Sequence, residues 1–175
     1  MHFTRSDSTQ RLGRRFIFAA WFLALLLLYG LFDGWLATTG NPNLVLTNRG
    51  SSAHPLVQLK QNPHGHYVAR GAINGIPVIF LLDTGATQVS IPGRLADKLQ
   101  LRAGTAQRAQ TAAGTVTTYS TRLDQVELGP IGLRNVNAHI NPHMPGEQVL
   151  LGMSFLRHFD FSQEGKILTI KPRAS

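Results

Sequence analysis

One long apolar run lies near the start of the chain, and many short apolar stretches follow it. The run extends from Phe16 to Phe32, seventeen residues without a charge. A membrane-spanning helix needs about 20 predominantly apolar residues, with a lower limit near 17. The pattern therefore predicts a transmembrane signal anchor over residues 16–36, after a basic cytoplasmic tail over residues 1–15.

The charges beside this run predict its orientation. Four arginines precede it and Asp33 follows it, so we expect a cytoplasmic amino terminus and a folded domain outside the cytoplasm. A cleaved signal peptide is the alternative, but its apolar core is usually about 7–15 residues long and ends at a small-x-small site. Only Leu36-Ala37-Thr38 faintly resembles such a site. A buried core helix is a further alternative, which we disfavour because the run is apolar on all sides and no polar face appears.

Turn-forming residues dominate the next part of the chain, residues 37–64. We interpret it as a linker that could contribute one edge strand. A His-x-His pair, His64 and His66, could ligate zinc or copper, but no acid or cysteine lies near it. The sequence therefore favours a solvated loop, and we expect no metal and no cofactor.

Short β-rich stretches separated by turn residues fill the predicted folded domain, residues 65–173. Asn74-Gly75 between two of them is a strong hairpin signal, because a type I′ turn needs positive φ at both positions. Such spacing predicts an all-β barrel or sandwich with one or two short helices. The expected strands cover 66–73, 76–82, 111–119 (a hairpin), 126–131, 136–140, 149–152 and 159–170 (a hairpin), and the expected helices cover 93–101 and 153–158.

The composition supports a globular core and limits the possible functions. Apolar residues make up 43% of the chain, and lysine and arginine outnumber acids 17 to 9. Beyond the first four arginines the basic residues are scattered, without the aromatic interleaving of a nucleic-acid site, so we expect no nucleic-acid partner. The absence of cysteine excludes disulfides and thiolate catalysis.

One acid stands at the end of an apolar strand. Phe80-Leu81-Leu82 runs directly into Asp83-Thr84-Gly85-Ala86. Because the strand is nearly all apolar, we expect it to be buried on both faces and to bring Asp83 into the interior. A buried carboxylate is costly unless it is hydrogen-bonded or shared, which makes Asp83 the candidate catalytic residue. A plain surface turn is the alternative interpretation.

Three segments together resemble one protomer of a retropepsin-like aspartic protease, most closely the bacterial membrane-anchored single-domain type. They are Asp83-Thr84-Gly85-Ala86 after an apolar strand, a central hairpin with a glycine near its tip, and Leu150-Leu151-Gly152 before a short helix. The run Asn135-Val136-Asn137-Ala138 also fits this pattern, and the resemblance covers about Tyr67 to Lys171.

The resemblance implies a closed β-barrel and a role for each matching residue. It implies catalysis by Asp83 and support of the catalytic loop by Thr84, Gly85 and Ala86. The implied flap over the substrate is Ala112, Ala113, Gly114 and Thr115, although an ordinary surface loop is the alternative. Leu150, Leu151 and Gly152 would pack beneath the catalytic loop. The implied location is the bacterial inner membrane, in a single pass, with the protease domain in the periplasm or otherwise outside the cytoplasm.

A single Asp-Thr-Gly sequence has a consequence for assembly. Hydrolysis by an acid pair needs two carboxylates close enough to share a proton. The other aspartates, Asp97, Asp124 and Asp160, do not follow an apolar strand with a glycine two places later. We therefore predict that the second carboxylate is Asp83 of another copy, across a two-fold axis.

Two functions remain open at this point. The first is a membrane-anchored, homodimeric aspartic endopeptidase that acts on a peptide or protein substrate. The alternative is a non-catalytic module that binds peptides or assembles an envelope complex. The intact Asp83 motif favours catalysis. Neither a Gly-x-Ser-x-Gly nor a His-Glu-x-x-His sequence is present, which disfavours a serine hydrolase or a zincin.

Overall fold

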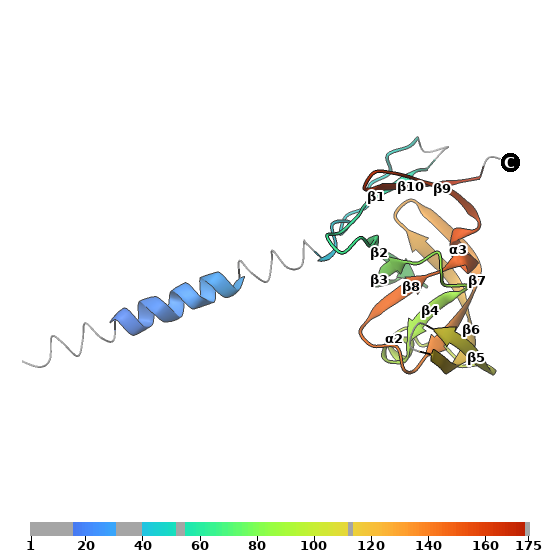
Figure 1. Ribbon diagram of the computed structural model, residues 1–175, viewed down its shortest axis with the longest axis horizontal. Helices are drawn as coiled ribbons and strands as arrows, with labels where there is room; N and C mark the ends of the chain where they lie inside the picture. The colour runs from blue at the N-terminus through green and yellow to red at the C-terminus, as the bar shows by residue number, and fades with distance from the viewer. Residues whose placement is uncertain (1–15, 31–39, 52–54, 112–113, 174–175) are drawn as a thin grey trace, which may run out of the picture. The chain divides into compact units, whose positions relative to one another are not determined.

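A computed structural model describes residues 16–30, 40–51, 55–111 and 114–173 of the chain. The chain forms two compact units, Met1–Thr39 and Gly40–Ser175. Residues 16–30 of the first unit form an exposed helix (Figure 1). Across the described ranges, no helix is long and apolar enough to span a membrane. The predicted tail over 1–15 and residues 31–36 of the predicted anchor lie outside these ranges.

The second unit is an all-β domain with two short helices, as the sequence predicted (Figure 1). Its first strands are β1 (Val57–Lys60), β2 (Val68–Ile73), β3 (Ile76–Leu82) and β4 (Val89–Pro92), which leads into helix α2 (Gly93–Lys98). The middle strands are β5 (Ala106–Thr111), β6 (Gly114–Leu128), β7 (Ile131–Asn141) and β8 (Gln148–Leu151). Helix α3 (Met153–Leu156) precedes the last two strands, β9 (Phe159–Glu164) and β10 (Ile167–Pro172).

Most of the strands form a closed barrel, which confirms that prediction. The larger sheet has the order β2-β3-β8-β4-β7-β6-β5, and β2 also pairs with β6. This extra pairing, which includes Ile73 opposite Val126, closes a ring from β2 to β6. Strand β5 pairs only with β6, outside the ring. Two pairs within the barrel, β3 with β8 and β4 with β7, are parallel.

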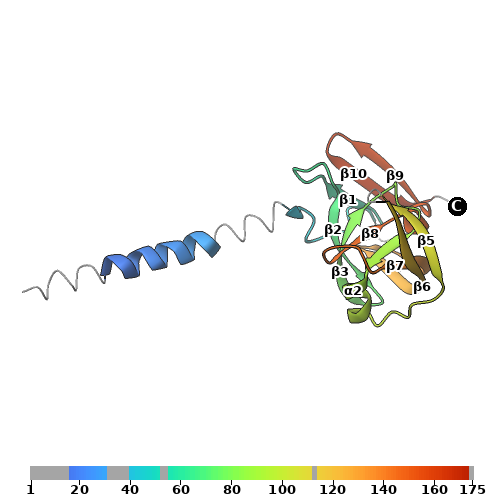
Figure 2. The same cartoon turned by 60° about the horizontal axis from the view of Figure 1, so that its bottom comes forward.

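The second sheet has three strands in the order β1-β10-β9 (Figure 2). Strand β1 belongs to the segment that we interpreted as a linker, and from Gly40 onward that segment is part of the folded unit. The linker interpretation is therefore wrong for residues 40–64, although the single edge strand that we allowed there is present.

Buried asparagines explain why this polar segment folds onto the domain. The Asn43 side chain donates to the carbonyls of Lys60 and Val68, both at 2.8 Å, and accepts from the Lys60 N–H at 2.7 Å. Asn43 N donates in turn to Oδ1 of Asn41 at 3.0 Å. Considered with its sequence neighbours alone, asparagine indicates a turn. Here its side-chain amide instead forms hydrogen bonds with backbone groups of residues 17 and 25 positions away.

The core lies within the barrel and between its end and the smaller sheet. Phe80 on β3 and Phe155 on α3 are its largest fully buried side chains. Along β3, Val78 and Phe80 are buried, whereas Ile79, Leu81 and Leu82 are only partly buried and Ile76 is exposed. The expectation that β3 is buried on both faces is therefore wrong, because the barrel covers only one of its faces.

Local turn signals gave the first hairpin correctly, but the turn between β6 and β7 was missed. Asn74 and Gly75 have φ values of 51° and 78°, and β2 and β3 pair from Ile73 and Ile76 outward. The predicted strand 126–131 instead contains a turn at Gly129, with φ of 57°. It includes the end of the long β6 and the first residue of β7. Within β6, polar residues alternate with inward-facing residues such as Leu123, so the strand continues past residue 119, where the predicted hairpin ended.

Candidate active site

Asp83 follows the last residue of β3, where β3 lies beside β8. The two strands run parallel with Leu82 opposite Leu151. The Asp83 N–H donates to the Leu151 carbonyl at 3.2 Å. The strand that was predicted to support the catalytic loop therefore holds the backbone of the acid itself.

A tight turn after Asp83 orients its carboxylate. Gly85 N–H donates to Oδ1 of Asp83 at 2.8 Å, and Ala86 N–H donates to the Asp83 carbonyl at 3.2 Å. A Cβ atom on residue 85 would lie 3.1 Å from Oδ1 of Asp83, so glycine lets the carboxylate sit against this N–H. A hydrogen bond to the ionised form favours that form.

The first turn of α3 holds the other end of the loop. Met153 N–H donates to the Ala86 carbonyl at 2.8 Å, and Ser154 N–H donates to the Thr87 carbonyl at 3.0 Å. These amides have no partner within their own helix. Oγ of Ser154 accepts from Val89 N–H at 3.0 Å. The loop is therefore fixed at both ends by β8 and α3.

Gly152 allows this close approach. A Cβ atom there would lie 2.4 Å from the carbonyl oxygen of Gln88 and 2.5 Å from that of Ala86. The structure thus places Leu151 and Gly152 against the loop, and Leu150 opposite Leu81 on β3 and Ser90 on β4. Sequence reasoning missed the contribution of Ser154, whose only signal was a hydroxyl residue directly after Leu-Leu-Gly-Met.

The predicted catalytic residue lies at the surface of the single chain. Asp83 is partly exposed, and Thr84 and Gly85 are exposed. The expectation that β3 brings Asp83 into the interior is therefore wrong for one copy. The reason is that β3 reaches the edge of the core before its end, where Leu81 and Leu82 are already only partly buried.

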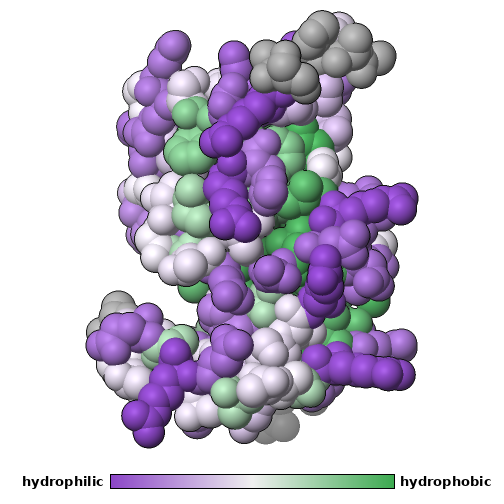
Figure 3. Space-filling model, turned by 90° about the vertical axis from the view of Figure 1, so that its right-hand side faces the viewer, coloured by the Kyte–Doolittle hydropathy of each residue, from purple (hydrophilic) through white to green (hydrophobic). Residues whose placement is uncertain are grey.

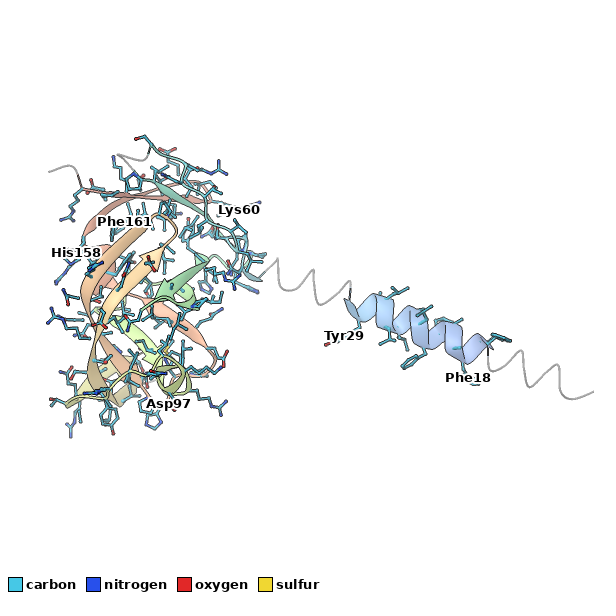
Figure 4. The ribbon with its side chains drawn as sticks, turned by 180° about the vertical axis from the view of Figure 1, so that it is seen from behind. Phe18, Tyr29, Lys60, Asp97, His158 and Phe161 are labelled. Carbon is cyan, nitrogen blue, oxygen red and sulfur yellow. The ribbon has the colours of Figure 1, made fainter. Side chains whose placement is uncertain are left out.

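The other aspartates lie on different elements. Asp97 is on α2 and Asp124 on β6, both exposed, and Asp160 lies 3.4 Å from Nε of Arg173. Figure 4 shows Asp97 at the opposite end of the domain from Phe161. Within the described ranges, the Asp83 carboxylate receives a hydrogen bond from Gly85 alone, and no group of three or more acids and histidines could hold a metal ion.

Strands β5 and β6 form the predicted central hairpin. The pairing reaches Thr111 opposite Gly114, with Oγ1 of Thr111 donating to the Gly114 carbonyl at 2.8 Å. Oγ1 of Thr115 donates to Oε1 of Gln110 at 2.8 Å. The other two predicted flap residues, Ala112 and Ala113, lie outside the described residues.

An apolar groove of about 350 Å³ opens beside the Asp83 loop. Thr84 of the loop lines it together with Tyr67 and Leu82, and the smaller sheet contributes Phe161, Gln163 and Leu168. Phe161 is 42% exposed, which is high for a large apolar side chain. The hydroxyl of Tyr67 is buried and has no hydrogen-bond partner among the described residues.

Among the described residues, His139 and Glu147 have shifted pKa values. Burial lowers the pKa of His139 on β7. A hydrogen bond from Lys98 lowers the pKa of Glu147, which is exposed. These shifts bear on stability and not on the candidate chemistry.

We compared the chain with models of known protein families. The family described as "gag-polyprotein putative aspartyl protease" matches residues 69–158, which is just over half of the chain. The chain belongs to this family. The match contains the Asp83 loop, both strands of the central hairpin and helix α3, and it identifies the barrel as that of a retropepsin-like aspartic protease.

Individual relatives are more distant. An uncharacterized protein in the cobV 5′ region of a Sinorhizobium species is 29% identical over 110 residues, which cover 61% of this chain and 47% of the relative. The chain thus spans about half the length of that curated relative.

A solved structure shares the fold of this domain. A retropepsin-like aspartic protease from Rickettsia conorii is 22% identical with a TM-score of 0.57, over 68% of this chain and 90% of the other. The EIAV protease complexed with the inhibitor HBY-793 is 20% identical with a TM-score of 0.46, over 57% of this chain and 92% of the other.

Proposed function

We propose that this chain is an aspartic endopeptidase whose active site combines Asp83 from two copies. The observation that carries the proposal is the position of Asp83. It lies in a loop fixed by β8 and α3, it receives the Gly85 N–H, and its own chain brings no second acid to it within the described residues.

The chemistry requires that the two carboxylates share one proton. The ionised carboxylate takes a proton from water as the water oxygen attacks the carbonyl carbon of the peptide bond. The protonated carboxyl group gives its proton to the carbonyl oxygen. As the tetrahedral intermediate collapses, the carboxyl group that took the water proton passes it to the amide nitrogen and the C–N bond breaks. The other carboxylate takes a proton from a hydroxyl of the intermediate, so a free carboxyl group and a free amine leave and the acid pair again shares one proton.

The residues around Asp83 have supporting roles in this proposal. The Gly85 N–H stabilises the ionised carboxylate. Thr84 is exposed beside the acid, where its hydroxyl could both donate to and accept from the other copy. The hairpin of β5 and β6, including Gly114 and Thr115, would close over the peptide and exclude water.

The groove beside the loop supports a dimer. Thr84 and Leu82 line it, so the surface that must face a second Asp83 is continuous with an apolar surface. The exposed Phe161 on the same groove is costly in an isolated chain. A second copy over this face would cover it.

Cleavage of a peptide library by the full chain tests the proposal. Asp83→Asn should abolish cleavage at every pH, whereas the matched change Asp97→Asn, at an exposed position on α2, should leave it intact. Sedimentation of the wild type should show a dimer. A cleaving Asp83→Asn protein, or an active monomer, would exclude the shared site.

The same variants distinguish the non-catalytic alternative. The apolar groove of about 350 Å³ is the observation that favours it, since such a groove can bind an extended peptide without cutting it. A binding module would keep its affinity for peptides after Asp83→Asn and would cleave none of them in the wild-type form.

The location of the protease outside the cytoplasm stays a prediction from the charge pattern of the first 36 residues. We propose a domain on the outer side of the bacterial inner membrane. Accessibility of the domain to an added protease in spheroplasts, with and without detergent, measures this directly. Digestion only after detergent lysis would contradict it.

A further inference from the structure

A second pocket lies away from the groove, between β7 and α3. Its volume is about 210 Å³. Its polar lining consists of Arg134, Asn135, Asn137, Ser154, Arg157 and His158, and two apolar residues complete it. None of these residues is part of the Asp83 loop, so the pocket has no place in the proposed hydrolysis.

The pocket carries positive charge that nothing in the described chain neutralises. Arg134 and Arg157 are always charged, and no carboxylate lines the pocket. The ion pairs of the described residues are Lys98 with Glu147 and Arg173 with Asp160, so neither arginine is paired. His158 lies at the edge of the domain in Figure 4, and Figure 3, which faces that edge, shows hydrophilic side chains projecting from it.

The neutral polar side chains of the pocket have hydrogen-bond donors without partners among the described residues. The side-chain amides of Asn135 and Asn137 make no hydrogen bond with the described residues. Oγ of Ser154 accepts from Val89 N–H, which leaves its own hydrogen free to donate. Two guanidinium groups, two amides, a hydroxyl and the imidazole of His158 therefore line one pocket, which is open to solvent because all of these residues except Ser154 are exposed.

The backbone at the pocket is distorted. Asn135 has a φ of 57° inside the eleven-residue strand β7. The pairing of β6 with β7 includes Leu123 opposite Val136 and Gln125 opposite Arg134, but no partner for Asn135. Asparagine tolerates this conformation better than most residues, and such unfavourable backbone positions concentrate at functional sites.

We infer that this pocket binds a small oxyanion, either a carboxylate or a phosphate group. Arginine forms paired, charge-assisted hydrogen bonds with both groups, and the amides and the hydroxyl supply further donors. Ser154 belongs to this pocket and also bonds the residues after the Asp83 loop, Thr87 and Val89. A bound anion would therefore stabilise the end of that loop.

Titration of the full chain with inorganic phosphate, followed by calorimetry, tests the inference. We expect saturable binding with a Kd of about 1 mM or lower. Loss of a charged hydrogen-bond donor weakens binding about tenfold, so the double variant Arg134→Gln/Arg157→Gln should bind about a hundredfold more weakly. The matched control is Arg70→Gln/Arg122→Gln, which removes the same charge from exposed positions on β2 and β6 and should bind as the wild type does.

A single nearly isosteric change gives an independent measurement. Asn135→Asp keeps the size of the side chain and the tolerance for positive φ, but places a carboxylate in the pocket. It should abolish phosphate binding while the protein stays folded by circular dichroism. Hydrogen exchange of the Val89 amide should slow in phosphate for the wild type and stay unchanged for this variant.

Competition identifies the source of the oxyanion. A glutamate-containing peptide that displaces phosphate, when its glutamine counterpart does not, shows that acidic side chains enter the pocket. Phosphate binding without such competition shows a site for the free anion. No saturable phosphate binding by the wild type, or an equal loss in the control variant, would overturn the inference. The Asp83→Asn variant should bind phosphate as the wild type does. The test of the pocket is therefore independent of whether the chain cleaves peptides.

Discussion

Oγ of Ser154 on α3 accepts a hydrogen bond from the backbone N–H of Val89 at 3.0 Å. Val89 is fully buried and Ser154 nearly so, and 65 residues separate them in the sequence. This bond joins the first turn of α3 to the strand that leaves the candidate catalytic loop. The loop therefore depends on a helix that carries no catalytic group.

Replacing Ser154 with alanine should measure this dependence. The change leaves the Val89 N–H buried without an acceptor, which costs about 1–3 kcal/mol. We expect the free energy of unfolding in urea to fall by that amount. Ser162→Ala on β9, where the side chain is exposed, is the control and should change it little. Equal stability of the two variants would mean that the hydrogen bond between Ser154 and Val89 does not contribute to the free energy of unfolding.

Gly152→Ala should damage the same region for a different reason. The added Cβ would overlap the carbonyl oxygens of Gln88 and Ala86, and backbone atoms cannot rotate away as a side chain can. Overpacking of this kind costs about 1–3 kcal/mol or more, and the shift should displace the Asp83 loop. We expect lower stability and lower peptide cleavage. Gly40→Ala, where a Cβ meets nothing within 4 Å, should change neither.

The sequence predicted those features that depend on neighbours in the chain. Asn74-Gly75 forms its turn because both residues adopt positive φ locally. The all-β class followed from the spacing of short strands, and the resemblance gave the closed barrel, the Asp83 loop and the strand beside it.

Features that depend on distant partners could not be predicted in this way. The segment around Asn43 has the composition of a linker. Its role in the fold becomes visible only when the Asn43 side-chain amide is seen to donate to the backbone carbonyls of Lys60 and Val68. The exposure of Asp83 depends on where the core ends, which hydropathy along β3 does not show. The contribution of Ser154 depends on a contact with Val89 across the barrel.

Asn43→Ala should show that the segment before β1 belongs to the fold. The change removes two donated hydrogen bonds and one accepted hydrogen bond. It leaves backbone groups of Lys60 and Val68 without these hydrogen-bond partners. At about 1 kcal/mol or more for each bond, we expect a loss of roughly 2–4 kcal/mol in the free energy of unfolding. Asn137→Ala, at an exposed position on β7, is the control. Matching stabilities of the two variants would contradict the role of Asn43.

Burial of His139 should make stability depend on pH. Its pKa in the folded chain is lowered from 6.5, so the unfolded chain binds more protons once the pH falls below that value, and the free energy of unfolding falls with it. We expect stability to fall as the pH drops through about 6.5, and His139→Gln should reduce this loss. His143→Gln, at an exposed position, should keep the full dependence. An unchanged pH profile in His139→Gln would assign the effect to other groups.

Tyr67→Phe separates the stability of one copy from the assembly of two. In an isolated chain the Tyr67 hydroxyl is buried without a partner, so its removal should leave the free energy of unfolding of a monomer unchanged or higher. Because this hydroxyl is already buried in the single chain, the same change should leave the affinity of the dimer unchanged. Phe161→Ser removes exposed apolar area from the same groove and should weaken the dimer about tenfold, an effect of about 1.4 kcal/mol. Sedimentation over a range of concentrations measures both variants. An unchanged dimer affinity in Phe161→Ser would place the interface elsewhere, even if Asp83 proved essential for cleavage.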